Sequence, residues 1–143
     1  MKDRGGPPYT LINHTADMGV RIRGSSLKEL FENAALALTD LLVSPGRHGE
    51  PAPFPLSVTG DDPVDLLVRW MGEVLYLFEG EARIVADVRI ETLTSDHIEA
   101  VARVFPFDPD RDEPLNQIKA VTYHKAGITE TDGQWEALLV LDV

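Results

Sequence analysis

The chain has 143 residues, a length that fits one domain and is short for two well-packed ones. Its 13 Lys and Arg against 24 Asp and Glu give a formal net charge of −11, which repels a phosphate backbone, so we expect no direct binding of nucleic acid. The absence of cysteine excludes disulfides, thiolate metal sites and cysteine nucleophiles. No stretch reaches the roughly 18 apolar residues of a membrane span and no signal peptide opens the sequence, so we expect a cytoplasmic protein without a membrane partner.

The first residues predict a short flexible segment followed by one folded domain. Residues 1–8 include Gly-Gly-Pro-Pro, which favours neither a helix nor a central strand, so the domain is expected to span 9–143. Two β-prone runs come next, Tyr9–Asn13 and Met18–Arg23, with a turn at His14-Thr15-Ala16-Asp17 between them.

Two amphipathic helices follow in the pattern. Ser26 and Glu29 form a capping-box signature, in which the glutamate is expected to bond back to the cap, and an apolar stripe continues from there to Val43. The second helix is expected to begin with an aspartate cap before a proline, at Asp62-Pro63, and to end at Gly80.

The rest of the sequence has the alternation of β-strands. One strand is predicted between the helices, one hairpin turns at Thr94-Ser95-Asp96, and a second is joined through Gly127 and Asp132-Gly133. The predicted strands are Phe54–Thr59, Ile84–Glu91, Ile98–Phe105, Ile118–Lys125 and Trp135–Val143. This order of elements predicts a single α+β domain, an antiparallel or mixed β-sheet with both helices packed on one face.

Three carboxylates stand where strands begin or end. Asp142 and the main-chain carboxylate of Val143 follow the apolar run Ala137–Leu141, and Asp17 directly precedes a strand. If the first and last strands end side by side, these three anions converge, and their hard oxygen atoms favour Ca²⁺, Mg²⁺ or Mn²⁺ over zinc. An aspartate in a turn is also a common local hydrogen-bond acceptor, so the residues alone leave both interpretations open.

The histidines show no helical pairing of the zinc-protease type. We expect His48, in a loop, and His97, at a hairpin, to be solvated. His14 and His124 are expected at strand ends, where a structural role and a site role both remain open.

The acidic segment 108–112 imitates the start of a calcium-binding EF-hand loop. The imitation fails because Glu113 stands where the loop needs glycine and Lys119 where it needs glutamate, so we reject a calcium loop there.

Two groups of motifs together resemble the archease family. The first is His14-Thr15-Ala16-Asp17-Met18-Gly19 with Phe31-Glu32-Asn33-Ala34-Ala35 in the following helix. The second is Ile118-Lys119-Ala120-Val121-Thr122-Tyr123-His124 with the Leu141-Asp142-Val143 ending. The resemblance runs in order from about Tyr9 to Val143. Departures are Met18, where the family has Ile or Val, and a loop from Phe107 to Leu115 that is richer in Pro and Asp.

The resemblance implies a function. Archeases are non-catalytic cofactors of the RtcB-type RNA ligase, which joins tRNA exon halves and other broken RNAs using GTP and Mn²⁺. A member of the family would promote guanylylation of the ligase's histidine and permit multiple turnover. The resemblance also implies a divalent-metal site made by Asp17, Asp142 and the terminal carboxylate of Val143. It gives His14, Lys119 and His124 supporting roles at the ligase-facing site.

Two other classes of function remain open from the sequence. A small metal-dependent hydrolase would use a cation at Asp17 and Asp142 to activate water, although the sequence offers no positioned base beyond His14 or His124. An acidic chaperone or protein-interaction module would use the carboxylates only as solvated charges.

Overall fold

The computed structural model describes residues 8–13 and 17–143. In this part of the chain the helices are α1 (Leu27–Leu42) and α2 (Pro63–Glu79). The strands are β1 (Tyr9–Asn13), β2 (Asp17–Gly24), β3 (Val43–Ser44), β4 (Ala52–Thr59), β5 (Arg83–Leu93), β6 (His97–Pro106), β7 (Glu113–Pro114), β8 (Ala120–Thr131) and β9 (Gln134–Asp142). Neither described helix is long and apolar enough to cross a membrane. Of the expected flexible segment 1–8 only Pro8 is described, and His14 also lies outside the described residues.

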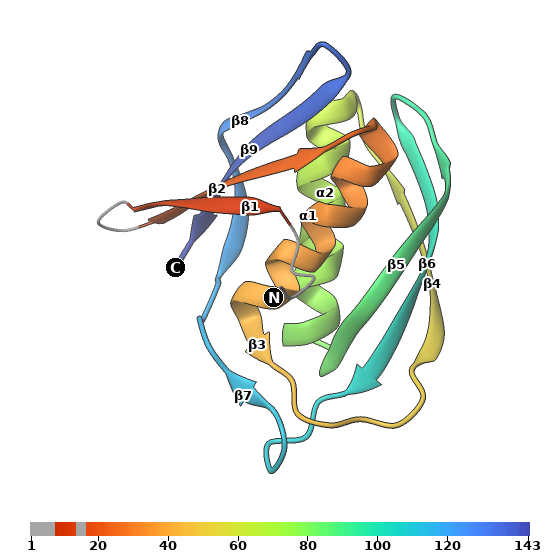
Figure 1. Cartoon of the computed structure of the whole chain (residues 1–143), viewed down its shortest axis with the longest axis vertical. Coiled ribbons are helices and arrows are strands. Elements are labelled where there is room, and N and C mark those ends of the chain that lie inside the picture. The colour runs from red at the N-terminus through yellow and green to blue at the C-terminus, as the bar shows by residue number, and fades with distance from the viewer. Residues whose placement is uncertain (1–7, 14–16) are drawn as a thin grey trace.

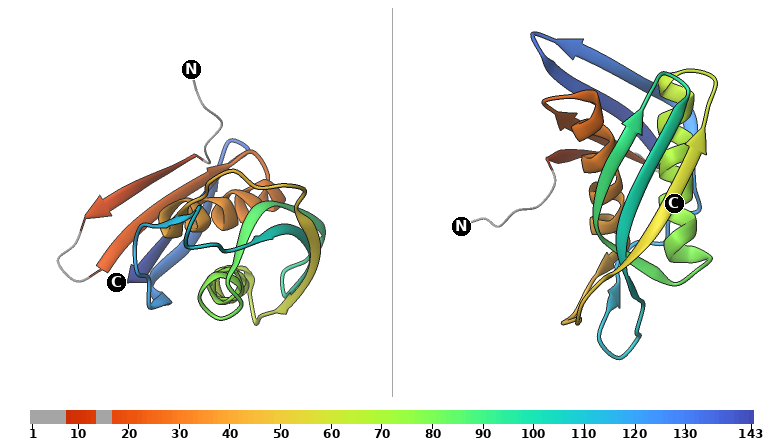
Figure 2. Two further views of the ribbon diagram at one scale, coloured as in Figure 1. Left: turned by 90° about the horizontal axis from the view of Figure 1, so that it is seen from below. Right: turned by 90° about the vertical axis from the view of Figure 1, so that its right-hand side faces the viewer.

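The strands form two main antiparallel sheets with the helices between them (Figure 1). One sheet has the order β1-β2-β9-β8, the other has the order β4-β6-β5, and β3 pairs with β7 in a small third sheet. Figure 2, seen from below, shows α1 and α2 separating the two main sheets. The α+β class and the antiparallel pairing are therefore confirmed.

The prediction of one sheet with both helices on one face is wrong in the number of sheets. The strands form two main sheets, and the helices cover one face of each. The reason is the width of the apolar surface on α1. Its buried residues come in adjacent pairs, among them Leu30 with Phe31 and Leu41 with Leu42, so the helix is apolar on more than one side. As a result α1 packs against β2 in one sheet and β5 in the other.

Both helix starts agree with the sequence, with one difference. Ser26 Oγ accepts from the amide of Glu29 at 3.0 Å, and Asp62 Oδ1 accepts from the amide of Asp65 at 2.9 Å. The expected reciprocal bond from Glu29 to the cap is wrong: the carboxylate instead accepts from the amide and hydroxyl of Ser25, at 2.7 and 2.9 Å. The cap itself is extended, with φ −151° and ψ 164°, the usual backbone conformation of an N-cap residue. These bonds lower the pKa of Glu29, the Ser25 amide contributing most.

Trp70 joins the two helices inside the core. Its side chain is fully buried, and its indole N–H donates to the carbonyl of Phe31 at 2.9 Å. A buried indole N–H without an acceptor would cost free energy, so this bond lets a large aromatic residue fill the space between α1 and α2.

Strand β8 is longer and less regular than the sequence predicted. It continues through Gly127 to Thr131, and the turn is confined to Asp132-Gly133, whose positive φ values of 52° and 80° suit a tight hairpin. Residues 123–126 form a bulge, because Thr122 pairs with Val140 while Gly127 pairs with the residue only two positions earlier on β9. The bulge moves the side chains before it and after it out of simple alternation.

Candidate functional site

The two candidate aspartates lie directly opposite each other. In the antiparallel pairing of β2 and β9, Asp17 is the partner of Asp142, and the next pair is Met18 with Leu141. Met18 and Leu141 pack on the core, so the aspartates project from the opposite face of the sheet. Directly opposed residues have Cβ atoms about 5 Å apart, close enough for two carboxylates to share one ligand. Both residues lie at the end of the two central strands of their sheet, β2 and β9, where the sheet meets solvent. We call Asp17 and Asp142 the sheet-edge site.

The two carboxylates differ in their surroundings. Asp17 is half-buried, with its Oδ1 atom buried, whereas Asp142 is exposed. Like charges directly opposite each other destabilise a sheet, and a cation bound between them would offset that repulsion. The donor set of the sheet-edge site therefore fits a hard divalent cation.

A metal site here needs a donor beyond acidic and histidine side chains. The described residues contain no group of three His, Cys, Asp or Glu side chains that could hold a metal ion. Val143 directly follows Asp142 and is 38% exposed, and the resemblance described above implies its main-chain carboxylate as the third donor.

Strand β8 fixes the backbone of the sheet-edge site from the other side. Ala120 is the partner of Asp142, and the amide of Lys119 donates to the carbonyl of Asp142 at 2.7 Å. The Thr122 hydroxyl donates to the carbonyl of Val140 at 2.9 Å. The end of β9 is thus hydrogen-bonded between two strands, which places Lys119, an exposed residue, beside the site.

His124 does not lie in this register. It is exposed within the bulge, which a neighbouring tyrosine ties to α2: Tyr123 donates to Asp65 Oδ1 at 2.6 Å, and Arg69 donates to Asp65 Oδ2 at 2.9 Å. The Tyr123 bond contributes most to lowering the pKa of Asp65, and the same bond raises the pKa of Tyr123. The Asp65 and Arg69 pair was visible in the sequence as a four-residue step, but no local signal pointed to Tyr123.

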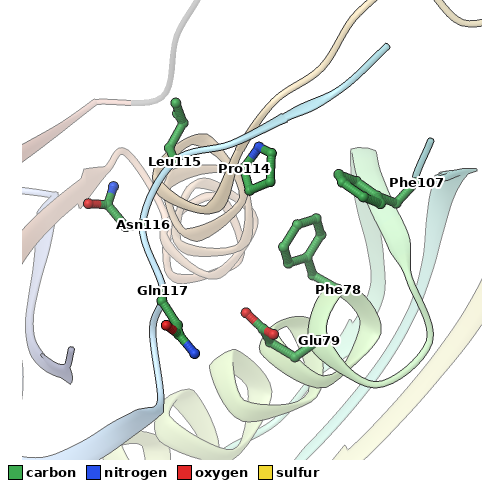
Figure 3. A pocket seen from close by; sticks show the side chains of 7 residues that line it. All are labelled: Phe78, Glu79, Phe107, Pro114, Leu115, Asn116 and Gln117. Carbon is green, nitrogen blue, oxygen red and sulfur yellow. The ribbon is translucent and has the colours of Figure 1, made fainter. Parts of the chain in front are cut away.

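A cavity of about 440 Å³ lies at the end of α2 (Figure 3). It is bounded by Phe78 and Glu79 of α2, by Phe107, and by residues 114–117. We call it the helix-end cavity. No local sequence pattern predicts this cavity, because its walls come from segments up to 39 positions apart.

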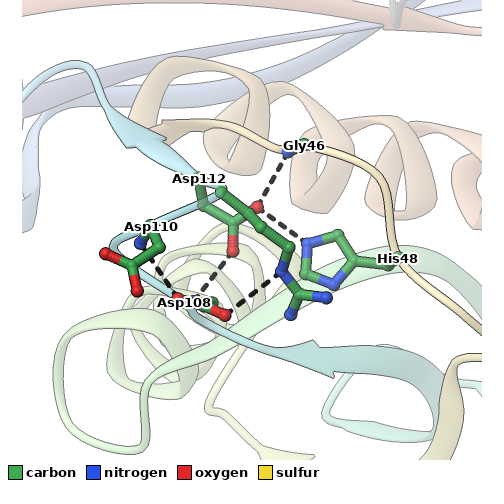
Figure 4. A network of polar contacts seen from close by, with 6 residues as sticks. Gly46, His48, Asp108, Asp110 and Asp112 are labelled. Carbon is green, nitrogen blue, oxygen red and sulfur yellow. Dashed lines mark hydrogen bonds and ion pairs between the residues drawn. The ribbon is translucent and has the colours of Figure 1, made fainter.

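The expectation that His48 is solvated is wrong. Its side chain is only 3% exposed, its ring stacks on Phe105 with centroids 4.3 Å apart, and its Nε2 lies 2.7 Å from Asp112 Oδ1 (Figure 4). Asp112, from the acidic segment rejected as a calcium loop, is buried and also accepts from the amides of Gly46 and Asp108, each at 2.8 Å. We call Gly46, His48, Asp108 and Asp112 the loop clamp, since their hydrogen bonds join residues 44–50 to residues 108–112.

The loop clamp controls the ionisation of its carboxylate. Burial raises the pKa of Asp112, and the amides of Asp108 and Gly46 with the His48 ring lower it by more, so that it lies below its usual value. Gly46 is required for steric reasons, because a Cβ there would lie 2.4 Å from the carbonyl oxygen of Arg111.

The other histidine that was expected to be solvated, His97, has a side chain that is one-third exposed, and its Nε2 lies 2.6 Å from Glu99 Oε2.

Comparison with known proteins gives one consistent family. The model of the archease protein family matches residues 9–143. Archeases of Methanosarcina acetivorans and Archaeoglobus fulgidus are 34% and 36% identical to this chain over 142 and 139 residues. Those alignments cover 96% and 94% of this chain and 97% and 98% of the relatives.

Two solved structures share the fold. The solution structure of a Methanobacterium thermoautotrophicum protein has a TM-score of 0.75 and 27% identity, covering 94% of this chain and 98% of that one. A Thermotoga maritima crystal structure, described as an archease and possible chaperone, has a TM-score of 0.63 and 18% identity. It covers 99% of this chain and 100% of its own. The second likeness shows the fold alone.

Proposed function

The chain belongs to the archease family, and from this premise we propose that it is a non-catalytic activator of an RtcB-type RNA ligase in cytoplasmic tRNA splicing and RNA repair. The observation that carries the proposal is the direct pairing of Asp17 with Asp142 at one edge of the sheet. The family resemblance assigns a metal site to these two residues, and their register supports that assignment.

In the proposal, Asp17, Asp142 and the main-chain carboxylate of Val143 hold a divalent cation, Ca²⁺, Mg²⁺ or Mn²⁺, through oxygen atoms. Such a cation would add positive charge beside the triphosphate of GTP when the ligase is guanylylated. The chain's own residues provide the geometry: the Lys119 amide holds the Asp142 carbonyl, and the pairing with β2 holds Asp17 opposite.

The charge of the chain supports a basic partner. An RNA ligase binds a polyanion and is therefore expected to present positive surface, which attracts a protein with a net charge of −11 and raises the rate of encounter. Lys119, beside the sheet-edge site, and His124, exposed in the bulge, are proposed contacts on the ligase-facing surface, with His14.

A second candidate function is an acidic interaction module of the chaperone class. The Thermotoga maritima protein is described as a possible chaperone, and the net charge of −11 on this chain fits such a role. In that case the carboxylates of the sheet-edge site act only as solvated charges, and replacing one of them by an amide should have little effect. A metal-dependent hydrolase, the third class, would show turnover of a phosphate ester by the purified chain alone.

The experiment is multiple-turnover RNA ligation by an RtcB-type ligase from the same source, with Mn²⁺ and GTP limiting. We expect the chain to raise the number of turnovers and the Asp142→Asn variant to lose that effect. The matched control is Asp132→Asn, the same change at the opposite end of the β8–β9 hairpin, where Asn tolerates the positive φ. Absence of stimulation by the wild type would reject the activator function, and full stimulation by Asp142→Asn would reject the role of the sheet-edge site.

A further inference from the structure

The helix-end cavity lies at the C-terminal ends of both helices. Figure 1 shows α1 and α2 running in the same direction and ending near β3 and β7. The amide of Leu115 donates to the Leu42 carbonyl at 2.9 Å and Asn116 Nδ2 donates to the Leu41 carbonyl at 2.7 Å, so the cavity wall lies on the last turn of α1. The last turn of α2 forms the opposite wall. The negative end of the α2 dipole therefore faces the cavity, and the negative end of the α1 dipole lies behind the wall that residues 114–117 form.

Nothing basic in the cavity wall offsets that potential. Neither helix has a basic residue in its last turn, and none of the described residues that line the cavity is Lys or Arg. The wall instead adds the carboxylate of Glu79, which is exposed and has no ion pair among the described residues. In Figure 3 this carboxylate is directed into the space between Phe78 and residues 114–117.

The cavity also offers aromatic surface. Phe78 and Phe107 pack edge to face, with centroids 5.5 Å apart and planes at 87°, which leaves ring surface toward the opening. A carboxylate beside aromatic rings is the combination that recognises a guanidinium group, which stacks on a ring and pairs with both carboxylate oxygens. A lysine ammonium lacks the planar group that would use both features.

We propose that the helix-end cavity receives an arginine side chain of the protein partner that docks over the sheet-edge site. The cavity and the sheet-edge site lie close together. Gln117 lines the cavity, and Ala120, three residues later, pairs with Asp142. An extended chain covers no more than about 11 Å between Gln117 and Ala120. Leu115, 49% exposed at the rim, provides apolar surface for the residues flanking that arginine. The identity of the partner, a basic RNA ligase, rests on the proposed function.

The cavity is tested first without any partner. The probe is blocked arginine, N-acetyl-arginine methylamide, titrated into the isotope-labelled chain, with blocked citrulline as the neutral isostere. We expect the amide resonances of Leu115, Asn116 and Gln117 to move with arginine and not with citrulline. Glu79→Gln should weaken the arginine response about tenfold, the scale of one charge-assisted pair. Glu73→Gln, the same change at an exposed position of α2, should leave it unchanged. The proposal would be overturned if blocked arginine and blocked citrulline shifted the amide resonances equally. It would also be overturned if the wild type and Glu79→Gln responded equally to blocked arginine.

The source of the arginine is tested by the affinity of the chain for the ligase. We expect Glu79→Gln to bind the ligase about tenfold more weakly while its affinity for divalent cations stays that of the wild type. Equal binding of the ligase by wild type and Glu79→Gln would overturn this inference and leave the proposed function intact. A wild-type chain that binds blocked arginine but not the ligase would overturn the proposed function and, with it, the assignment of the arginine to that partner.

Discussion

The pairing of two carboxylates at the sheet-edge site predicts that Asp142→Asn has opposite effects with and without a divalent cation. The charges of Asp17 and Asp142 stand on directly opposed residues, at a separation of about 6 Å, where their repulsion is about 0.7 kcal/mol in water and about 3 kcal/mol at an effective dielectric constant near 20. Because Asp142 is exposed, the lower end applies. In a buffer that contains a metal chelator, the free energy of unfolding of Asp142→Asn should therefore exceed that of the wild type by about 1 kcal/mol.

With metal the order should reverse. A ligand at about one hundred times its dissociation constant stabilises the folded state by about 2.7 kcal/mol, which corresponds to a rise of about 5–10 °C in Tm for a chain of this size. The assay is thermal unfolding in chelator and then across a titration of Ca²⁺ or Mn²⁺. The wild type and Asp132→Asn should gain this increment, and Asp142→Asn should not. An Asp142→Asn variant that is destabilised in chelator would mean that the two carboxylates do not repel each other, and one that gains as much as the wild type with metal would mean that Asp142 does not bind the cation.

Other predictions concern the end of the chain, the loop clamp and the bulge. One residue added after Val143 displaces the terminal carboxylate and should weaken metal binding at least about tenfold in the same titration, consistent with loss of a ligand; unchanged affinity would remove that carboxylate from the site. Asp112→Ala leaves three donors without their acceptor and should cost about 3 kcal/mol in urea unfolding, whereas Asp110→Ala, an exposed neighbour, should cost little. Because the folded pKa of Asp112 is depressed, its contribution to stability is complete above the unfolded pKa and is lost as the pH falls through the folded pKa; the gap between wild type and Asp112→Ala should therefore narrow in acid, and a gap that widens there would contradict the assignment. Tyr123→Phe removes the bond to Asp65 that ties the bulge to α2 and should reduce stimulation of the ligase with little change in Tm; unchanged stimulation would exclude a role for the bulge.

Features set by neighbouring residues were predictable from the sequence. The caps at Ser26 and Asp62 depend on contacts within three positions, and the turn at Asp132-Gly133 depends on two residues that accept positive φ. The division into two sheets was not predictable in the same way. Alternation along a strand indicates that one face is buried, but it carries no information on which side of a helix covers that face.

The convergence of Asp17 and Asp142 could be predicted only on the condition that their two strands lie side by side. The sequence predicted Asp17 in the turn directly before one strand and Asp142 at the end of another, and the register between those strands depends on packing across the whole domain. The loop clamp could not be anticipated, because His48 and Asp112 are 64 positions apart and each looks like an ordinary loop residue. Tyr123 was missed for a similar reason, since the bulge that presents it is an irregularity of register.

In the proposed function, the paired carboxylates of this chain promote the guanylylation step of the ligase. The most direct measurement is the rate at which the ligase forms its covalent guanylate from GTP, in the absence of RNA and with divalent metal limiting. We expect the wild type to accelerate this step, Asp132→Asn to do so equally, and Asp17→Asn and Asp142→Asn not to accelerate it. Equal acceleration by the wild type and Asp142→Asn, or no acceleration by the wild type, would contradict this proposal.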